Sequence, residues 1–328
     1  MHQNIAGFGG DPDKVTIFGQ SSGGVAADWW TFAYKDDPLV NGIISESGNA
    51  FSFPLNSREL QTRNWFNISR ALGCGEGGDT LACVRGKDWR DVLAAAARLP
   101  AAPGGNPIRS TPAFYPTVDN ETVFSGYASL LEQGKFAKIV SIHSPIYERP
   151  HLLTNPSQPH LLGNNHNEQG YYIIPAYSRG INTTLAQRDQ FLLESFTCPN
   201  AFVARARAAH GVPVWQYRYF GDWANTRLYP GSGAYHGTEM QMLFGNSGDV
   251  SGIEPSEEQE RLTRVMQRAW VEFARDPIRG LEEFGWPQHA EGEETLVRLG
   301  YENSDVPDFV RPEVYSWNCS NIVLAGGQ

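Results

Sequence analysis

The chain has 328 residues, of which 41% are hydrophobic and 12% aromatic, and its formal net charge is −10. This composition can fill a sizeable core, which argues against a disordered chain. The acidic balance argues against nucleic acid or an anionic membrane as a partner, and no apolar run is long enough to span a bilayer.

Strands and helices are expected to alternate along the chain. Short apolar runs predict strands at residues 15–18, 42–45, 159–163 and 212–220. Helical patterns occur at residues 24–33, 58–72, 89–99, 185–194 and 200–209. The run at 212–220 alternates in period two, which is typical of a strand with one buried face. This alternation implies an α/β fold with a mainly parallel sheet and helices on both faces.

The clearest helix signal begins at Ser256. Ser256 and Gln259 have the spacing of a capping box, and apolar residues then recur at helical intervals. The Asp-Pro pair at 276–277 ends this helix. The chain has no internal repeat and no clean linker, so we expect one domain over residues 1–328. The Pro- and Gly-rich stretch at 100–116 then becomes a long surface excursion.

The stretch VTIFGQSSGG, residues 15–24, fits a G-x-S-x-G pattern centred on Ser21. An ordinary Gly/Ser turn fits the pattern alone equally well, but here a predicted strand precedes it and a predicted helix follows. On such an elbow Ser21 would occupy a strained turn, and flanking glycines would avoid collisions with neighbouring backbone. The helix N-terminus just beyond it favours a developing anion. Ser21 is therefore the candidate nucleophile.

A serine nucleophile needs a base, and on an elbow of this kind the chain order is nucleophile, acid, histidine. His236 lies in a Gly-rich loop after the period-two strand, a setting that the other seven histidines lack. Glu168 follows a predicted strand and a Gly-Asn-Asn turn, where its carboxylate could accept the histidine Nδ1–H. The alternatives are a surface glutamate and a histidine without a catalytic role. His166 and Glu168 lack further ligands at the spacing of a metal site.

The cysteines leave several arrangements open. They are Cys74, Cys83, Cys198 and Cys319. None belongs to a Cys-x-x-Cys pair, so a structural zinc site is not indicated. Two disulfides in any of three pairings, or four free thiols in a reducing compartment, fit the sequence.

Four motifs strongly resemble those of the type-B carboxylesterases, the cholinesterase and lipase group of α/β-hydrolases. They read NIAGFGGDPDKVTIFGQSSGG, ISESGNAF, GNNHNEQG and GAYHGTE, and the resemblance extends from about Asn4 to the C-terminus. It implies an α/β-hydrolase fold with Ser21 as nucleophile, Glu168 as acid and His236 as base. The implied activity is hydrolysis of a small-molecule carboxylic ester or lipid through an acyl-enzyme, without a metal or organic cofactor.

The same resemblance implies supporting positions around the triad. Ser47, in SESG, matches a serine that lies near the triad and can hydrogen-bond it, and Glu239 matches a supporting polar position. The chain departs from the usual residues at Gln20, Ser22 and Asn167. Aromatic residues near the motifs fit an acyl pocket or core packing: Trp29, Trp30, Phe51, Phe53, Tyr171 and Tyr172.

Secretion is a further expectation from the resemblance. It implies a Cys74–Cys83 disulfide and a second disulfide between Cys198 and Cys319. Four Asn-x-Ser/Thr sequons give weak support for a glycoprotein. They are Asn67, Asn120, Asn182 and Asn318. The first residues of this chain contain no apolar segment of a signal peptide.

Members of this family carry several strands and a Gly-Gly oxyanion loop before the elbow, and this sequence begins just before the nucleophile strand. We therefore expect a truncated form or a partial gene model, with the backbone N–H of Ser22 as the identifiable oxyanion donor. The strand at 15–18 would then have an unpaired edge. Two rival hypotheses are a non-catalytic binding or adhesion protein of the same fold and an inactive fragment. The sequence does not indicate acyl or alcohol preference, or oligomeric state.

Overall fold

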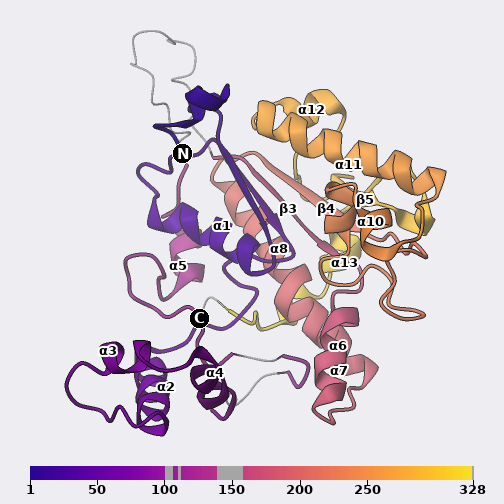
Figure 1. The fold of residues 1–328 in the computed structure, drawn as a ribbon. Coiled ribbons are helices and arrows are strands. Elements are labelled where there is room, and N and C mark those ends of the chain that lie inside the picture. Colours follow the sequence, from indigo (N-terminus) through magenta and orange to yellow (C-terminus); the bar gives the residue numbers. More distant parts are fainter. Residues whose placement is uncertain (100–105, 110–111, 139–157, 327–328) are drawn as a thin grey trace.

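The computed structural model describes residues 1–99, 106–109, 112–138 and 158–326, and a six-stranded sheet lies at its centre (Figure 1). The strands cross the sheet in chain order: β1 (Thr16–Gln20), β2 (Gly42–Glu46), β3 (His160–Asn165), β4 (Val214–Tyr219), β5 (Leu296–Leu299) and β6 (Asp308–Val310). Neighbours from β1 to β5 are parallel, and β6 runs antiparallel to β5. The predicted α/β class with a mainly parallel sheet is confirmed, and β1 forms one edge.

Three helices cover one face of the sheet. They are α1 (Ser22–Ala33), α5 (Tyr127–Glu132) and α8 (Cys198–Ala209). Val25 of α1 and Val203 of α8 join a buried cluster with Leu162 of β3 and Val214 of β4. Since successive strand residues point to opposite faces, the neighbours Leu161 and Trp215 belong to the other side.

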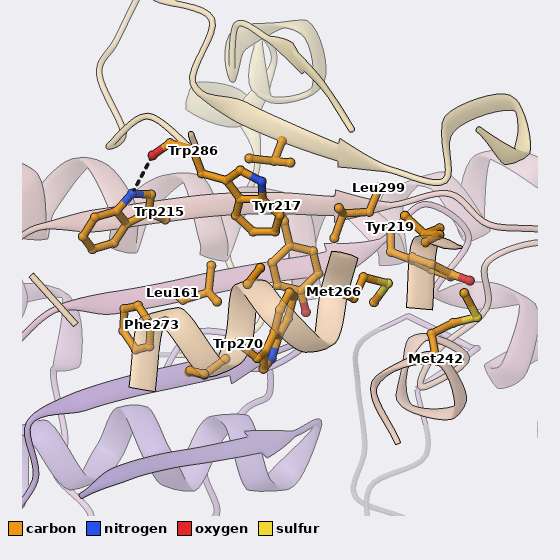
Figure 2. Close-up of a cluster of buried hydrophobic side chains, with 14 of the residues drawn as sticks. Leu161, Trp215, Tyr217, Tyr219, Met242, Met266, Trp270, Phe273, Trp286 and Leu299 are labelled. Atoms are coloured by element: carbon orange, nitrogen blue, oxygen red, sulfur yellow. Dashed lines mark hydrogen bonds between the residues drawn. The ribbon is translucent and has the colours of Figure 1, made fainter. Parts of the chain in front are cut away.

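The opposite face is covered by α11 (Glu257–Arg275), with α12 (Gly280–Phe284) beside it (Figure 1). The apolar stripe predicted for this segment points into the core, where Phe273 meets Trp215 edge to face at 5.9 Å between ring centroids (Figure 2). Trp270 packs in the same cluster. Burial of such large apolar side chains on both faces stabilises the sheet.

The remaining helices lie at the ends and periphery of the sheet. The α-helices are α2 (Arg58–Ala71), α3 (Thr80–Arg85), α4 (Trp89–Ala97), α6 (Gln169–Ser178), α7 (Leu185–Leu192), α9 (Glu239–Leu243), α10 (Ser247–Ser251) and α13 (Glu313–Ser316). A π-helix spans Leu193–Thr197, and 3-10 helices span Ile5–Phe8, Tyr301–Asn303 and Cys319–Asn321. Residues 100–105 and 110–111 of the predicted surface excursion lie outside the described residues. Within the described ranges, no helix has the length and apolar character needed to cross a bilayer.

β4 differs from its prediction, because all six of its residues are buried instead of one face. Its polar residues have partners there. Gln216 Nε2 donates to the carbonyl of Asn200 at 3.4 Å, and the Arg218 guanidinium lies 4.4 Å from the ring centroid of Tyr315. The polar residues at alternate positions of β4 therefore do not face water. They are buried and paired with other side chains or backbone groups.

The N-terminus of α11 also differs in part from its prediction. Ser256 caps the helix by accepting from the Gln259 backbone N–H at 3.2 Å. The Gln259 side chain donates instead to Ser247 Oγ of α10, also at 3.2 Å, so the expected reciprocal capping box is half formed. A complete capping box occurs at α7, between Thr184 and Gln187, where none was predicted.

A buried ion pair joins two helices on one face of the sheet. Arg207 of α8 and Asp28 of α1 are both fully buried, with Nη2 2.6 Å from Oδ1. Arg207 also donates to Thr31 Oγ1 at 2.7 Å, and Asp28 Oδ2 accepts from the Ala50 backbone N–H at 2.9 Å. These additional hydrogen bonds offset part of the cost of removing both charges from water.

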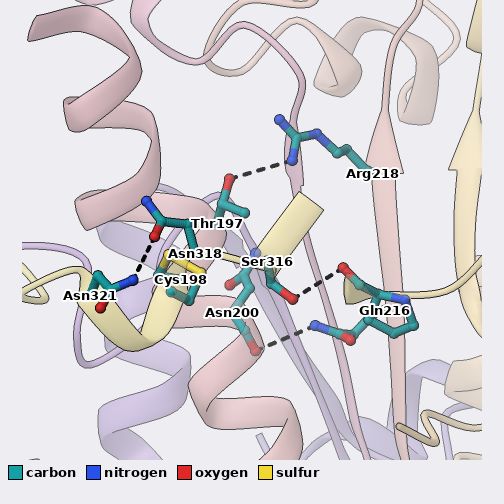
Figure 3. Close-up of a disulfide and its surroundings, with 10 residues drawn as sticks. Thr197, Cys198, Asn200, Gln216, Arg218, Ser316, Asn318 and Asn321 are labelled. Atoms are coloured by element: carbon teal, nitrogen blue, oxygen red, sulfur yellow. Dashed lines mark hydrogen bonds between the residues drawn. A yellow bond between two sulfur atoms is a disulfide. The ribbon is translucent and has the colours of Figure 1, made fainter. Parts of the chain in front are cut away.

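Two disulfides fasten peripheral segments. Cys74 is bonded to Cys83 and Cys198 to Cys319, which is the pairing that the family resemblance implies. Cys198 is the first residue of α8, so the second bond attaches this helix to the C-terminal segment (Figure 3). The segment continues beside the core, where the Gly326 backbone N–H donates to the Phe51 carbonyl at 2.9 Å.

Candidate active site

The candidate nucleophile lies on a sharp turn between β1 and α1. Ser21 has φ 59° and ψ −119°, a conformation that is strained for a residue with a side chain. The strand and helix approach each other so closely that a Cβ on Gly19 would collide with the Gly23 backbone. A Cβ on Gly24 would lie 2.7 Å from the carbonyl oxygen of Gly48 in the neighbouring turn. The glycines of the motif are therefore required for this close packing.

The turn delivers the N-terminus of α1 next to the Ser21 side chain. Ser21 is the N-cap residue, and the Val25 backbone N–H returns to its carbonyl at 3.0 Å. The N–H groups of the first turn, including that of Ser22, have no partner within the helix and point out of its N-terminal end. They provide hydrogen-bond donors and the positive end of the helix dipole beside the hydroxyl.

The candidate acid lies at the end of β3, directly before α6, and is completely buried. Glu168 Oε1 accepts from the Ser47 hydroxyl at 2.6 Å and from the Asn165 backbone N–H at 2.7 Å. Its other oxygen, Oε2, lies 2.6 Å from His236 Nδ1. Three donors thus surround one buried carboxylate, and Ser47 contacts the acid as the resemblance implies.

The candidate base lies on the loop after β4, with 7% of its side chain exposed. Because His236 Nδ1 faces the Glu168 carboxylate, that nitrogen carries the proton and Nε2 is the acceptor in the neutral ring. The amide nitrogen of Gln20 lies 3.2 Å from Nε2, and the Tyr172 hydroxyl lies 3.1 Å from it. These two donors come from the elbow and from α6.

Two side chains contact the Nε2 atom of His236 in this arrangement. Among the described residues, the neighbours that hydrogen-bond His236 Nε2 are Gln20 and Tyr172. Burial, followed by the charge of Glu168, raises the pKa of Tyr172 above its ordinary value, and the nearby Ser21 hydroxyl lowers it by less. The tyrosine is therefore neutral at physiological pH.

A family model for the carboxylesterases matches residues 1–193 and 189–317. The chain belongs to the carboxylesterase family. A protein named Secreted lipase 5, from Gibberella zeae, is 32% identical over 92% of this chain and 55% of its own length. Chlorogenic acid esterase from Aspergillus niger is 26% identical, over 90% of this chain and 54% of its own. Para-nitrobenzyl esterase from Bacillus subtilis is 27% identical, over 90% and 60%. This carboxylesterase chain therefore spans about half the length of the curated relatives it matches.

Two more buried carboxyl groups of the carboxylesterase chain lie near Glu168. Glu239, predicted to support the triad, hydrogen-bonds the Asn165 side chain, and Asn165 in turn contacts Glu168 through its backbone. Burial and the charges of Glu168 and Glu46 raise the pKa of Glu239 well above its ordinary value. Burial also raises the pKa of Glu46 to about 7, against a hydrogen bond from Trp270 Nε1 at 2.6 Å that lowers it. Sequence reasoning missed Glu46, although its place in SESG next to Ser47 is a usable signal.

Only some of the expected pocket aromatics surround the base. The ring centroids of Tyr172, Phe196 and Tyr171 lie 4.9, 5.3 and 6.3 Å from that of His236. Phe53 reaches this group through Phe196, at 6.0 Å. Trp29, Trp30 and Phe51 pack in the core or against other helical residues instead: their partners are Tyr127, Tyr34 and Phe202. Phe196 was not predicted, because it lies on a π-helix that the sequence pattern does not distinguish from α7.

His166 takes a structural position. Its ring stacks on Phe220 at 4.6 Å between centroids, and burial together with the charge of Arg218 lowers its pKa to about 4. Across the described part of the chain, no group of three or more metal-ligating side chains is close enough to hold an ion.

The predicted glycosylation sites differ in exposure. Asn120 and Asn182 are exposed, whereas Asn67 and Asn318 are half-buried. In the sequon of Asn67, Ser69 is fully buried and donates to the Gly75 carbonyl at 2.6 Å. Its hydroxyl is therefore already engaged in the fold.

Proposed function

We propose that Ser21, Glu168 and His236 form the triad of a carboxylic ester hydrolase that works through an acyl-enzyme. The observation that carries the proposal is the 2.6 Å contact between Glu168 Oε2 and His236 Nδ1, facing the strained elbow that presents Ser21. Membership of the carboxylesterase family supports the same reaction class. The names of the relatives, which describe esterases and a lipase, agree with it.

The reaction follows from the proton positions. His236 takes up the proton that Ser21 loses, Ser21 Oγ bonds to the ester carbonyl carbon, and the resulting imidazolium is stabilised by Glu168. The same proton then goes to the departing alcohol as the acyl–oxygen bond breaks. Water repeats the sequence on the acyl-enzyme and regenerates Ser21.

The negative charge of the tetrahedral intermediate needs donors. The Ser22 backbone N–H, at the first position of α1, is the donor that we assign on this chain. The positive end of the α1 dipole adds to its effect. Because the N–H belongs to the backbone, a change of the Ser22 side chain should leave it in place.

The substrate class that we propose is a small carboxylic ester or lipid, and the proposed location is extracellular. Two disulfides suit an oxidising compartment. The exposed asparagines Asn120 and Asn182 are the sequons most accessible to a glycosylating enzyme.

The proposal is tested by a fluorophosphonate probe and by p-nitrophenyl ester hydrolysis, on the 328-residue chain produced in an oxidising compartment. We expect the native chain to be labelled and Ser21→Ala to lose both labelling and hydrolysis. Ser22→Ala is the matched control, because it removes an exposed neighbouring hydroxyl but keeps the backbone donor. A folded native chain that is never labelled, or a Ser21→Ala chain that is labelled equally, would contradict the proposal and favour a binding role.

A further inference from the structure

Asn165, the last residue of β3, lies between the candidate acid and the loop that carries the candidate base. It is fully buried, and its backbone is fixed by pairing with Tyr219 of β4. The Asn165 backbone N–H donates to Glu168 Oε1 at 2.7 Å. The main chain of this residue is therefore already bound to the acid.

The side-chain amide of Asn165 binds the loop of His236 on both sides of the histidine. Its nitrogen Nδ2 donates to the Tyr235 carbonyl at 2.7 Å and to Oε2 of Glu239. Tyr235 directly precedes His236, and Glu239 follows it by three residues at the start of α9. Because a carbonyl oxygen can only accept, the nitrogen of the amide must face Tyr235, and its two hydrogens match the two acceptors.

The histidine loop has little stiffness of its own. Gly233 and Gly237, on either side of His236, have φ 56° and 84°, in the left-handed region that glycine adopts readily. A segment with this freedom loses much conformational entropy when it is held in one position, so it needs contacts from outside the loop. The hydrogen bonds from the buried end of β3 are contacts of this kind.

A second asparagine holds a different part of the same loop. Asn167 donates from its backbone to the Ala234 carbonyl at 2.9 Å and from its side chain to the Ser232 carbonyl at 2.6 Å. Both acceptors lie before Tyr235. Asn165, by contrast, reaches residues before and after the histidine, so loss of its amide should displace the imidazole itself.

We propose that Asn165 is a positioning residue that keeps the imidazole of His236 in contact with Glu168. This inference rests on the proposed ester hydrolase function. With its main chain on the acid and its side chain on the histidine loop, Asn165 holds the two partners of the 2.6 Å contact at a fixed separation. Catalysis depends on this geometry, because the Glu168 carboxylate stabilises the imidazolium that forms when His236 takes up a proton.

The experiment compares Asn165→Ala with Asn64→Ala on the 328-residue chain. Asn64 is also buried, and its side chain donates to the Ala113 carbonyl at 2.6 Å, but it lies on α2, which contributes no residue to the site. Since a small misplacement of reacting groups can cost about 10²-fold, we expect kcat of Asn165→Ala to fall by about 10- to 100-fold, with KM within about twofold of native. Asn64→Ala should keep kcat within about twofold of native, although both variants lose a buried hydrogen bond.

A second readout separates positioning from a general loss of stability. The Nδ1–H of His236 points at a buried carboxylate and should give a low-field proton resonance in NMR spectra, assigned by its absence in His236→Ala. In Asn165→Ala this resonance should shift or disappear through exchange with water, whereas in Asn64→Ala it should stay in place. Asn165→Ser, whose hydroxyl has one hydrogen for the two acceptors, is the variant to measure if Asn165→Ala does not fold.

In a folded Asn165 variant, either a native kcat or an unmoved resonance would overturn the proposal, as would an equal fall of kcat in Asn64→Ala. These outcomes are distinct from failure of the proposed function. If Ser21→Ala retains hydrolysis, the nucleophile is wrong, and the resonance, recorded without substrate, then decides alone whether Asn165 holds the pair together. Matching near-ultraviolet circular dichroism of the variants shows that each is folded.

Discussion

Arg207 and Asp28 form a fully buried ion pair, 2.6 Å from Nη2 to Oδ1, that joins α8 to α1, the helix that follows the nucleophile elbow. Both helices flank the site: α1 begins directly after Ser21, and α8 follows the π-helix that bears Phe196. The pair therefore connects the elbow helix to the helical segment that packs around His236. Loss of this ion pair should therefore affect the position of the site residues as well as the stability of the fold.

Replacement of Arg207 by Leu is expected to destabilise the chain. The Asp28 carboxylate would stay buried without its counter-charge, and breaking one side of such a pair costs about 3–5 kcal/mol in the free energy of unfolding. Chemical denaturation of the purified variant measures this. Arg264→Leu is the matched control, because its pair with Glu260 lies on the exposed surface of α11, where an ion pair contributes about 0–1 kcal/mol. Equal losses in both variants would refute the role of burial.

Replacement of Ser47 by Ala is expected to slow turnover without unfolding the chain. The variant removes the 2.6 Å hydrogen bond to Glu168 Oε1, and a bond to a charged group contributes about 1.5–3 kcal/mol. If about half of this loss is felt in the transition state, kcat falls by about 3- to 10-fold. Ser47 has φ 50°, a strain that alanine shares, so the backbone is unaffected. Steady-state kinetics on a p-nitrophenyl ester provide the measurement, and a native kcat would show that Ser47 does not position the acid.

Replacement of Glu46 by Gln is expected to change how stability depends on pH. Burial raises the pKa of Glu46 in the fold to about 7, above the ordinary value of 4.5. The contribution of Glu46 to the free energy of unfolding is therefore fully present below pH 4.5. It is lost as the pH rises through 7, by on the order of 3 kcal/mol. Gln stays neutral and keeps an oxygen for Trp270, so the variant should lose less stability between pH 5 and 8. Denaturation curves across that range decide this, and parallel losses in both proteins would exclude Glu46 as the cause.

The parts of the fold that the sequence predicted well are those in which local chemistry dictates the geometry. Gly19 and Gly24 are needed where the strand and helix touch, so the elbow around Ser21 is visible as a motif. Glu168 and His236 were predicted from their places in loops after strands, and the structure brings them into direct contact.

Other features depend on partners that are distant in sequence. Arg218 looks like an exposed strand residue until Tyr315, almost a hundred positions later, covers it. β5 and β6 are short and were not predicted as strands; they are defined by their pairing with neighbours in the sheet. The sequence indicated Tyr172 only as an aromatic residue of an acyl pocket or of the core, because no one-dimensional pattern records where a hydroxyl points.

The bond from Cys198 to Cys319 has a practical consequence for anyone who prepares this protein. The Ala325 N–H donates to the Glu194 carbonyl at 3.0 Å, and the Cys198–Cys319 bond is the covalent attachment of this tail to α8. The Glu194 carboxylate also forms an ion pair with Arg109, 2.6 Å from Oε1 to Nη2, next to the aromatic group around the base. Protein expressed in a bacterial cytosol would therefore lack the disulfide that attaches this tail. The choice of expression host then becomes an experimental variable.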